Sequence, residues 1–553
     1  MNKLISDEIR DKIAKAAGVE VEKVNLEHPK VDEFGDFSTN IALRNEKPRE
    51  YAQELAIKLR DDPMFAKVEV AGGGFLNIWL RNEYFVNVLN RVLIDGIKSI
   101  TPLVLDGKRI VIDYSAPNIA KYFGIGHLRS TIIGQAIYNT MKFLGANVIG
   151  DNHLGDWGTQ FGKLMFMISR EKLESFNIAM LEDLYVEFHK HPDWEEEGKK
   201  WFKKLEDGDS EARNMWKKCI EVSMTEFERI YEILGVKIDE VYGESFYENK
   251  MSEIIDLAKK TNLARISEGA LIVETEASKA PLILVKSDGG TTYATRDLAT
   301  LKFRREKWDP DEIIYEVGAE QTEYFKQIFE VGRKMGIVRE SVKLVHTRHG
   351  MYLGLDGKKF KTRTGNTIRL EEVLEEAIER ARKLGNTEDD KARAVGVGAI
   401  KYFDLMHSVQ SDIIFEWEKV MNLEGNSGPY LQYTFARTQS VLAKSGRVED
   451  LPDGRQSMGD YLPNIEELRI LRWLYRFPEV ISEAANRYAP SLVCTYLFEL
   501  AQRFNGFYNK HSILTPEEKV FEVRDFRLKL TGGVGEVMKT GLKLLGIEAL
   551  EKM

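Results

Sequence analysis

The fold is decided by residues 110–131, Ile-Val-Ile-Asp-Tyr-Ser-Ala-Pro-Asn-Ile-Ala-Lys-Tyr-Phe-Gly-Ile-Gly-His-Leu-Arg-Ser-Thr. The apolar run that opens it, Ile110 to Ile112, predicts a buried strand. A loop with Gly124 and Gly126 separates this strand from a helical pattern of apolar residues that stops at Gly145. Free N–H groups at a helix start bind anions. The stretch therefore predicts a strand, an anion-binding turn and a helix.

Hydrogen-bond donors surround this predicted anion site. Lys121, His127 and Arg129 lie beside the turn, and Asp113 lies at its entrance. A dinucleotide-binding turn is the first alternative, but Arg129 occupies the third glycine position of that motif. The Gly-Lys-Ser/Thr sequence of a P-loop is also missing there. An imidazole at the start of the helix can donate a hydrogen bond to phosphate oxygens, a contact that a nicotinamide dinucleotide fold does not require. We therefore favour a phosphate-binding turn over a dinucleotide-binding one.

The composition describes a globular protein of several domains, with 553 residues, 43% of them apolar and 30% charged. The net charge of −9 permits a polynucleotide partner without indicating one, because a basic groove can lie on an acidic body. Cys219 and Cys494 are far apart, which excludes a cysteine zinc site and indicates a reducing compartment. Residues 1–10 resemble neither a secretion signal nor a transit peptide, and no stretch approaches the roughly 20 apolar residues that a membrane span needs, so we expect neither. We expect a cytoplasmic monomer.

Three domains are predicted. Residues 1–82 combine an amphipathic helix with strand-like alternation, which indicates a small α+β domain. Strands and helices alternate over residues 108–425, the pattern of a Rossmann-type parallel sheet, and residues 426–553 are almost wholly helical. The candidate strands are 109–113, 147–152, 281–286, 312–317 and 342–347. A charged helical stretch at about 160–260 is too long for a crossover and is predicted to be an insertion.

Four further clusters complete the candidate site. They are Asn152-His-Leu-Gly-Asp-Trp-Gly158, Gly290-Thr-Thr-Tyr-Ala-Thr-Arg-Asp297, Gly318-Ala-Glu-Gln321 and Lys358-Lys-Phe-Lys-Thr-Arg-Thr-Gly-Asn366. The carboxyl ends of parallel strands bind ligands. Tyr293 and Asp297 share a face if their segment is helical, and Asp297 with Asp113 would suit a guanidinium. The cations after Lys358 predict an anion-binding loop. Each cluster also has a purely structural alternative. The glycine-rich clusters could be ordinary turns, Asp297 could be an exposed aspartate, and the cations after Lys358 could be solvated surface residues.

Taken in order, these stretches resemble the arginyl-tRNA synthetases, a family of class I aminoacyl-tRNA synthetases, over nearly the whole chain. Residues 115–121 and 126–131 surround the family's HIGH signature, and residues 152–162 are close to diagnostic. Residues 35–42 are similar to its N-terminal tRNA-binding domain, and residues 424–433 and 544–553 to its helical anticodon-binding domain. Gly124 replaces the first histidine of HIGH, and the KMSKS position, from Lys359, lacks its second lysine.

The resemblance implies ATP-dependent attachment of L-arginine to tRNA(Arg) through an arginyl-adenylate. It implies Mg²⁺ on the ATP and no metal site in the protein. Members of the family generally bind tRNA before they activate arginine. Our hypothesis is that Lys121 supplies the phosphate charge that the KMSKS position lacks.

The resemblance also assigns site residues. The residues assigned to catalysis are His127, Lys121, Lys359, Lys361 and Arg363. Those assigned to ATP binding are Gly124, Gly126, His127, His153, Gly155, Gly318 and Met351, and those assigned to arginine binding are Asp113, Asn118, Tyr293, Asp297 and Gln321. Those assigned to tRNA binding are Tyr433, Arg437 and Met553. Tyr433 could instead belong to the core. Two other functions stay open: a class I synthetase or nucleotidyl transferase with a different amino acid, and a catalytically impaired tRNA-binding protein.

Overall fold

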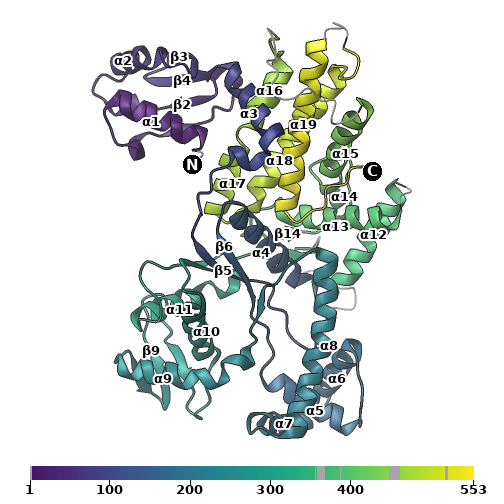
Figure 1. Ribbon diagram of the computed structural model, residues 1–553. Helices are drawn as coiled ribbons and strands as arrows, with labels where there is room; N and C mark the ends of the chain where they lie inside the picture. Colours follow the sequence, from purple (N-terminus) through teal and green to yellow (C-terminus); the bar gives the residue numbers. More distant parts are fainter. Residues whose placement is uncertain (1–2, 355, 358–367, 386–387, 447–460, 517–520) are drawn as a thin grey trace.

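The computed structural model describes residues 3–354, 356–357, 368–385, 388–446, 461–516 and 521–553. Figure 1 shows a small N-terminal domain and a helical C-terminal domain at the top of the molecule, with a mixed α/β region below them. No helix in these ranges is long and apolar enough to cross a membrane.

A five-stranded parallel sheet forms the centre of the α/β region. It has the order β12-β11-β5-β6-β7, with strands β5 (Arg109–Asp113), β6 (Asn147–Asn152), β7 (Glu240–Val241), β11 (Glu312–Tyr315) and β12 (Lys343–His346). Ile110, Val111 and Ile112 of the central strand are at most 1% exposed. Burial on both faces explains why this strand is an unbroken apolar run in the sequence. The predicted parallel sheet is confirmed.

Two details of that prediction are wrong. The expected strand 281–286 contains β10 (Leu282–Val285), which pairs antiparallel with β9 (Ala270–Val273) and not with the parallel sheet. β9 also pairs with β8 (Ala264–Ser267) to complete a separate three-stranded sheet. Ile283 is 43% exposed, so β10 is open on one face, and a short apolar run does not reveal which kind of sheet it joins. The fifth parallel strand is β7, whose two residues are too few for a sequence pattern.

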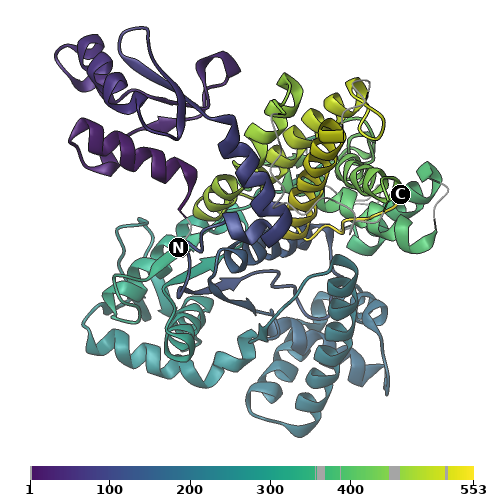
Figure 2. The same cartoon turned by 45° about the horizontal axis from the view of Figure 1, so that its top comes forward.

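Helices cover and extend the parallel sheet. Helix α4 (Ile125–Phe143) connects β5 to β6, α10 (Tyr293–Trp308) leads into β11, and α11 (Thr322–Lys334) connects β11 to β12. The predicted insertion range holds the helices α5 (Thr159–Arg170), α6 (Ile178–His189), α7 (Glu195–Glu206), α8 (Ser210–Leu234) and α9 (Met251–Lys260). The chain returns to the sheet at β7, between α8 and α9. Figures 1 and 2 show α5–α8 on one side of the sheet and α9–α11 on the other.

The N-terminal domain is an antiparallel sheet packed against two helices. Its strands have the order β1-β2-β4-β3, and its elements are α1 (Ile5–Ala17), β1 (Leu26–Glu27), β2 (Phe37–Thr39), α2 (Pro48–Arg60), β3 (Phe65–Ala71) and β4 (Phe75–Leu80). Glu479 of the C-terminal domain accepts hydrogen bonds from the N–H of Ser6 at 3.1 Å and from His28 at 2.7 Å. These bonds attach the N-terminal domain to the C-terminal one.

The C-terminal region is helical, as predicted. Its elements are α12 (Leu370–Gly385), α13 (Asp389–Leu405), α14 (Trp417–Val420), α15 (Gly428–Lys444), α16 (Ile465–Leu474), α17 (Phe477–Asn486), α18 (Pro490–Lys510) and α19 (Phe521–Leu544). A short parallel pair, β13 (Tyr352–Leu353) with β14 (Ile413–Ile414), lies at its junction with the α/β region. Helix α3 (Asn82–Asp95) packs on α16 and α19, and the rings of Phe85 and Tyr475 stack there.

Candidate active site

The turns that follow β5 and β6 lie side by side at the carboxyl edge of the sheet. Asn118 and Gly155 form an isolated bridge, and the N–H of Ile119 donates to the Gly155 carbonyl at 3.3 Å. A Cβ atom at position 155 would lie 2.5 Å from Oδ1 of Asn118, so a side chain there would displace the asparagine. The structure therefore brings together one residue predicted to bind arginine and one predicted to bind ATP.

The loop between β5 and α4 has a strained backbone. Ser115, Ala116 and Ala120 have φ angles of 77°, 45° and 63°. Hydrogen bonds hold this loop in place: the N–H of Ser115 donates to Oγ of Ser130, and that of Ala116 donates to Oδ1 of Asn152, both at 3.0 Å. Strain of this kind gathers at functional sites, where the surrounding structure enforces it. The loop that carries Asn118 is therefore fixed before any ligand binds.

The predicted anion-binding turn is the N-terminus of α4. Gly124 directly precedes the helix, and no described atom would lie within 4 Å of a Cβ atom at Gly126. The half-buried ring of His127 meets the edge of Phe123, with 5.5 Å between the ring centroids. The N–H groups of Ile125 and His127 already donate to the carbonyls of Ile368 and Gly124, at 3.0 Å and 2.9 Å. The turn therefore offers an anion the exposed backbone of Gly126 and the imidazole of His127. Lys359, Lys361 and Arg363, which were predicted to complete the anion site, lie outside the described residues.

The chain beyond those basic residues is attached to the same turn. The N–H of Ile125 donates to the carbonyl of Ile368 at 3.0 Å, and the N–H of Leu370 donates to the carbonyl of Phe123 at 2.8 Å. The sequence gave no signal for this pairing, because it joins backbone groups of distant segments. It places residue 368, at the carboxyl end of the basic stretch, beside the first residues of α4.

The helical insertion contacts the two cations that flank the turn. Nζ of the exposed Lys121 lies 5.1 Å from the ring centroid of Tyr185 on α6. The guanidinium of Arg369 stacks 3.6 Å from the ring centroid of Tyr122 and donates to Glu182 of α6 at 3.2 Å. Aromatic rings attract cations through their electron-rich faces. Helix α6 therefore holds Lys121 beside the anion-binding turn.

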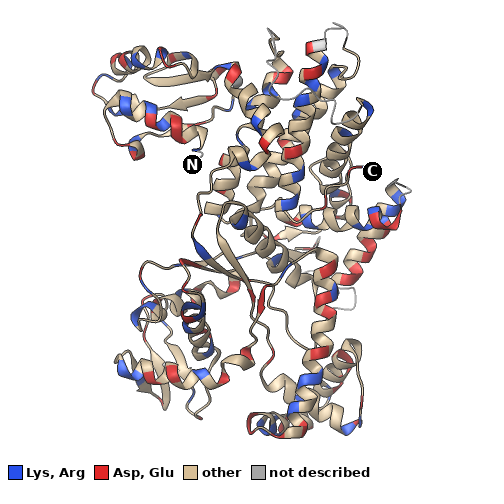
Figure 3. Cartoon of the chain, in the orientation of Figure 1, with Lys and Arg blue, Asp and Glu red and all other residues tan. Residues whose placement is uncertain are grey.

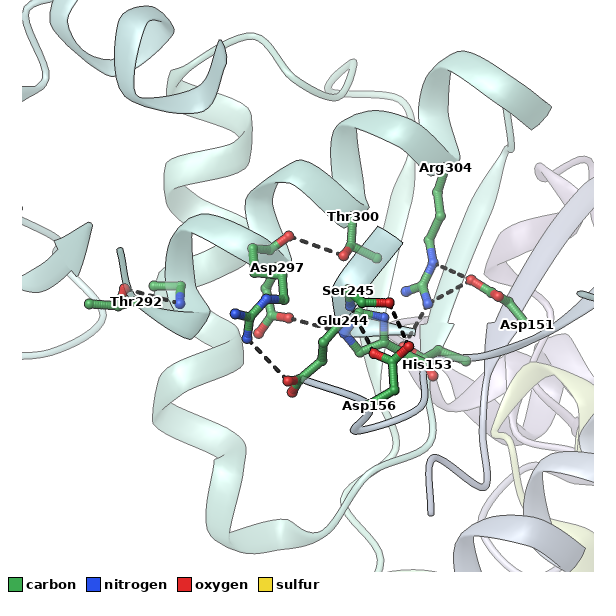
Figure 4. A network of polar contacts seen from close by, with 12 residues as sticks. Asp151, His153, Asp156, Glu244, Ser245, Thr292, Asp297, Thr300 and Arg304 are labelled. Carbon is green, nitrogen blue, oxygen red and sulfur yellow. Dashed lines mark hydrogen bonds and ion pairs between the residues drawn. The ribbon is translucent and has the colours of Figure 1, made fainter. Parts of the chain in front are cut away.

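Asp297 lies on α10 among aromatic side chains. The hydroxyl of Tyr324 donates to Oδ2 of Asp297. Nε2 of His153 lies 3.9 Å from Oδ1 of Asp297, and Figure 4 shows these two side chains close together. Tyr293 lies one helical turn earlier and is 67% exposed, with its ring centroid 5.4 Å from that of Tyr324. Burial raises the pKa of Asp297 to about 6 and lowers that of His153 to about 4. At neutral pH the pair is a carboxylate beside an uncharged imidazole.

The second predicted acid, Asp113, has a partner within the protein. Arg304 of α10 donates through Nη2 to Oδ2 of Asp113 and through Nε to Oδ2 of Asp151, both at 2.8 Å (Figure 4). Arg304 and Asp151 are completely buried. Burial raises the pKa of Asp151 to about 6, an effect that Arg304 partly offsets. The sequence offered no pattern for this triad, because its members come from two strands and a helix.

A second internal guanidinium lies beside Asp297. Arg296 donates through Nη1 to Glu244 at 3.2 Å and through Nη2 to Glu248 at 3.1 Å. Asp156 fixes this acidic segment by accepting hydrogen bonds from the N–H of Ser245 at 2.8 Å and from its hydroxyl at 2.6 Å (Figure 4). Sequence reasoning missed Arg296 and its partners; the only hint was the position of Arg296 next to Asp297.

A cavity of about 580 Å³ opens beside this cluster, between α7 and the antiparallel sheet. Tyr293, Tyr324, Arg296 and Glu248 are among the residues that line it. Trp157 and Phe202 add aromatic surface. The cavity therefore combines flat apolar walls with charged groups, which is typical of ligand sites.

The remaining predicted ligand-binding residues follow β11 and β12. Gly318 bridges to His349, and Gln321 is partly exposed at the start of α11. Nδ1 of His349 lies 2.8 Å from Oε1 of the buried Glu316, which also accepts a hydrogen bond from Thr347. Met351 is half-exposed, and its N–H donates to Asp412 at 2.7 Å. These turns lie at the same edge of the sheet as Asp113.

The predicted tRNA-binding residues form an exposed aromatic and cationic surface on α15 and α18. Tyr433 is 45% exposed, so it is not a core residue. The guanidinium of Arg437 lies 4.8 Å from the ring centroid of Tyr433 and 4.9 Å from that of Tyr508. It also donates to Asn505. Met553 is exposed at the last position of the chain.

The structure and its relatives define a class of enzyme. Residues 88–417 match the model of the family "tRNA synthetases class I (R), catalytic domain". Residues 3–80 match "Arginyl tRNA synthetase N terminal domain", and residues 431–553 match "DALR anticodon binding domain". The region that contains the parallel sheet is thus the catalytic domain of a class I aminoacyl-tRNA synthetase.

Full-length relatives specify the member of this class. The arginine–tRNA ligase of Exiguobacterium sibiricum is 40% identical over 567 residues, covering 99% of this chain and 98% of the relative. That of Aliivibrio fischeri is 37% identical over 580 residues, covering 100% and 99%. The crystal structure of arginyl-tRNA synthetase from Plasmodium falciparum superposes with a TM-score of 0.85 at 26% identity, covering both chains fully. The chain belongs to the arginyl-tRNA synthetase family, and its activity is that of an arginine–tRNA ligase.

Proposed function

We propose that the site joins L-arginine to tRNA(Arg) in two steps. The carboxylate of arginine attacks the α-phosphate of ATP and expels pyrophosphate, which gives the arginyl-adenylate. A terminal ribose hydroxyl of the tRNA then attacks the adenylate carbonyl and releases AMP. Neither step needs a nucleophile from the protein, so the site acts by positioning its substrates and stabilising charge.

One observation carries the assignment of the arginine pocket, namely the environment of Asp297. Its carboxylate is partly buried, is ionised at neutral pH and adjoins a neutral His153 that adds no competing charge. A guanidinium that displaced solvent there would gain charge-assisted hydrogen bonds, which lysine's single ammonium could not reproduce. In this proposal Tyr293, Gln321 and Asn118 orient the rest of the substrate.

Replacement of Asp297 tests this assignment. We expect Asp297→Ala to raise the KM for arginine about a hundredfold or more, because the loss of one partner of a desolvated charge pair costs ~2–5 kcal/mol. The KM for ATP should stay within about threefold of the wild-type value. Asp256→Ala, which removes an exposed aspartate from helix α9, is the matched control. An unchanged KM for arginine in Asp297→Ala would refute the assignment.

The phosphates of ATP belong, in this proposal, at the N-terminus of α4. Gly124 and Gly126 let the phosphates approach the backbone of the turn, and His127 and Lys121 supply side-chain donors. Gly155, His153, Gly318 and Met351 would line the nucleotide from the neighbouring turns. Lys359, Lys361 and Arg363 would neutralise the departing pyrophosphate, and Mg²⁺ would arrive on the ATP phosphates.

Lys121 is the sharpest test of the phosphate assignment. We expect Lys121→Ala to reduce adenylate formation by roughly a hundredfold or more, since losing one well-aimed donor costs about 2.7–4 kcal/mol. Lys142→Ala is the matched control, because the ammonium of Lys142 also lies 5.1 Å from a tyrosine ring, that of Tyr138 on α4. Arginine-dependent pyrophosphate exchange in the presence of tRNA measures both variants. Equal activities would exclude Lys121 from phosphate binding.

The helical domain is proposed to bind the anticodon loop of tRNA. Tyr433 can stack on an unpaired base, Arg437 can contact phosphate, and Met553 offers apolar surface. Figure 3 shows acidic and basic residues interspersed over the helices, so the negative net charge does not come from one continuous acidic face. The proposal includes tRNA binding before arginine activation, and a monomeric enzyme that works in the cytoplasm.

A further inference from the structure

A buried lysine lies at the junction between the α/β region and the helical domain. Lys401 of α13 is 2% exposed, and its ammonium donates hydrogen bonds to the carbonyls of Leu234 and Gly546. Leu234 is the last residue of α8, and Gly546 lies two residues beyond the end of α19. Two helices from distant parts of the chain therefore end at one ammonium, at the junction seen in Figure 1.

The surroundings of Lys401 are made for an ammonium and not for an ion pair. Among the described residues, no carboxylate forms an ion pair with it, and burial lowers its pKa to about 8, so the ammonium is still charged at neutral pH. The last carbonyls of a helix lack partners within the helix and lie at the negative end of its dipole. Gly546 has a φ angle of 68°, and a Cβ atom there would lie 3.0 Å from Nζ of Lys401. The close approach therefore depends on glycine.

The segment after α19 also contacts the helix that carries the proposed tRNA-binding residues. Nε2 of the completely buried Gln432 on α15 donates to the carbonyl of Glu548 at 2.9 Å. Gln432 directly precedes Tyr433, which is proposed to stack on a base of the tRNA. On the opposite side, Asn139 of α4 donates to the carbonyl of Leu544 at 3.2 Å. A displacement of α15 would therefore reach the segment that the ammonium holds.

Helix α8 extends from the same ammonium to the strained loop between β5 and α4. The hydroxyl of Tyr231, one turn before the end of α8, lies 2.8 Å from Oγ of Ser115 and accepts a hydrogen bond from Asn152 at 3.0 Å. Earlier in the helix, Oγ of Ser223 accepts a hydrogen bond from the N–H of Ala120 at 2.8 Å. Helix α8 thus holds both ends of the loop that carries a residue proposed to bind arginine.

We propose that Lys401 is a positioning residue that couples tRNA binding on α15 to the arrangement of the arginine-binding loop. Lys401 touches neither substrate. A tRNA that displaces α15 moves the segment after α19, the ammonium transmits this movement to the end of α8, and Tyr231 and Ser223 adjust the loop. Networks of hydrogen bonds between packed elements can carry such coupling. The inference rests on the proposed function, in which tRNA binds before arginine is activated.

Lys401→Met tests the coupling, because methionine has a similar volume and donates no hydrogen bond. Equilibrium dialysis measures the affinity for labelled arginine with and without tRNA(Arg), and filter binding measures the affinity for tRNA with and without arginine. We expect tRNA to tighten arginine binding about fivefold or more in the wild type and less than about twofold in Lys401→Met, with the same change in the reciprocal measurement.

The matched control is a second buried lysine of the helical domain. Lys529 of α19 is also 2% exposed, but it pairs with Asp525 at 3.0 Å. Lys529→Met should lower the thermal stability and leave the effect of tRNA on arginine affinity at the wild-type ratio. If Lys401 had only a structural role, Lys401→Met would behave in the same way, and this result would overturn the proposal.

Tyr231→Phe provides a second variant that removes one hydroxyl and keeps the ring in its place. We expect it to reduce the effect of tRNA on arginine affinity, and the double variant Lys401→Met/Tyr231→Phe to lose no more than Lys401→Met alone, because both side chains act in one path. Additive losses would overturn the proposal, and so would an unchanged ratio in Tyr231→Phe if Lys401→Met did not fold. A wild type whose affinity for arginine ignores tRNA would instead contradict the tRNA-first order of the proposed function, and the coupling with it.

Discussion

Arg304 and Arg296 lie about two turns apart on α10, and each holds two carboxylates, yet their surroundings differ completely. Arg304 is fully buried and joins Asp113 and Asp151, which lie at the carboxyl ends of neighbouring strands, Asp113 as the last residue of β5 and Asp151 as the residue before the last of β6. Arg296 lies in a cavity wall and joins two partly exposed glutamates. The difference shows that one residue type can form a fully buried ion triad and a partly exposed one on the same helix. What separates the two clusters is how far water can reach their carboxylates.

Stability should separate the two clusters most strongly. We expect Arg304→Met to lower the free energy of unfolding by about 3–5 kcal/mol, because it leaves two buried carboxylates without a cation. Arg296→Met should lower it by about 1 kcal/mol or less, since water can reach its partners. Urea denaturation at pH 7 and pH 5 measures both. Arg304→Met should recover part of its stability at pH 5, where protonation removes the unpaired charges. Equal losses of unfolding free energy in the two variants would contradict the difference that we infer between the two clusters.

The pH dependence of arginine binding gives a smaller effect. Burial raises the pKa of Asp297 to about 6, so its carboxylate is protonated as the pH falls through that value. The substrate guanidinium stays charged throughout, and it binds the ionised form. The KM for arginine should therefore be constant above about pH 7 and rise roughly tenfold per unit well below pH 6. Asp297→Asn, which cannot ionise, serves as the control.

This profile also sharpens the comparison of the two clusters. Asp151 and Glu244 have pKa values raised by burial to about 6 and about 7. If either of them governed arginine binding, the inflection would persist in Asp297→Asn. Its disappearance would assign the titration to Asp297.

Local patterns predicted much of the fold. The apolar runs of β5 and β11 and the periodicity of α4 are strong signals because burial imposes them. β10 misled the prediction, since four apolar residues in a hairpin resemble four in a parallel sheet. Strand β7 was not predicted because its two residues are too few to show a periodic pattern in the sequence. The helical C-terminal region was predictable because proline and glycine residues mark where its helices begin and end.

The sequence named candidate residues of the site but not their partners. Tyr293 and Asp297 could be related by helical spacing, and Asn118 and Gly155 by their positions after strands. Arg304 could not be connected to Asp113, because a buried ion triad depends on packing between distant segments. Asp113 and Asp297 were both predicted to bind the substrate; the structure gives the first an internal guanidinium, and the second a tyrosine hydroxyl and a neutral imidazole.

The most direct test of the account compares arginine with citrulline, whose side chain has the same shape but no charge. The KM for arginine and the inhibition constant of citrulline should be measured in arginine-dependent pyrophosphate exchange, in the wild type and in Asp297→Asn. The account predicts that the wild type prefers arginine by about a hundredfold or more, and that Asp297→Asn reduces this preference to less than about tenfold. If Asp297→Asn kept the wild-type preference for arginine, another group would bind the guanidinium, and the central role of Asp297 would be contradicted.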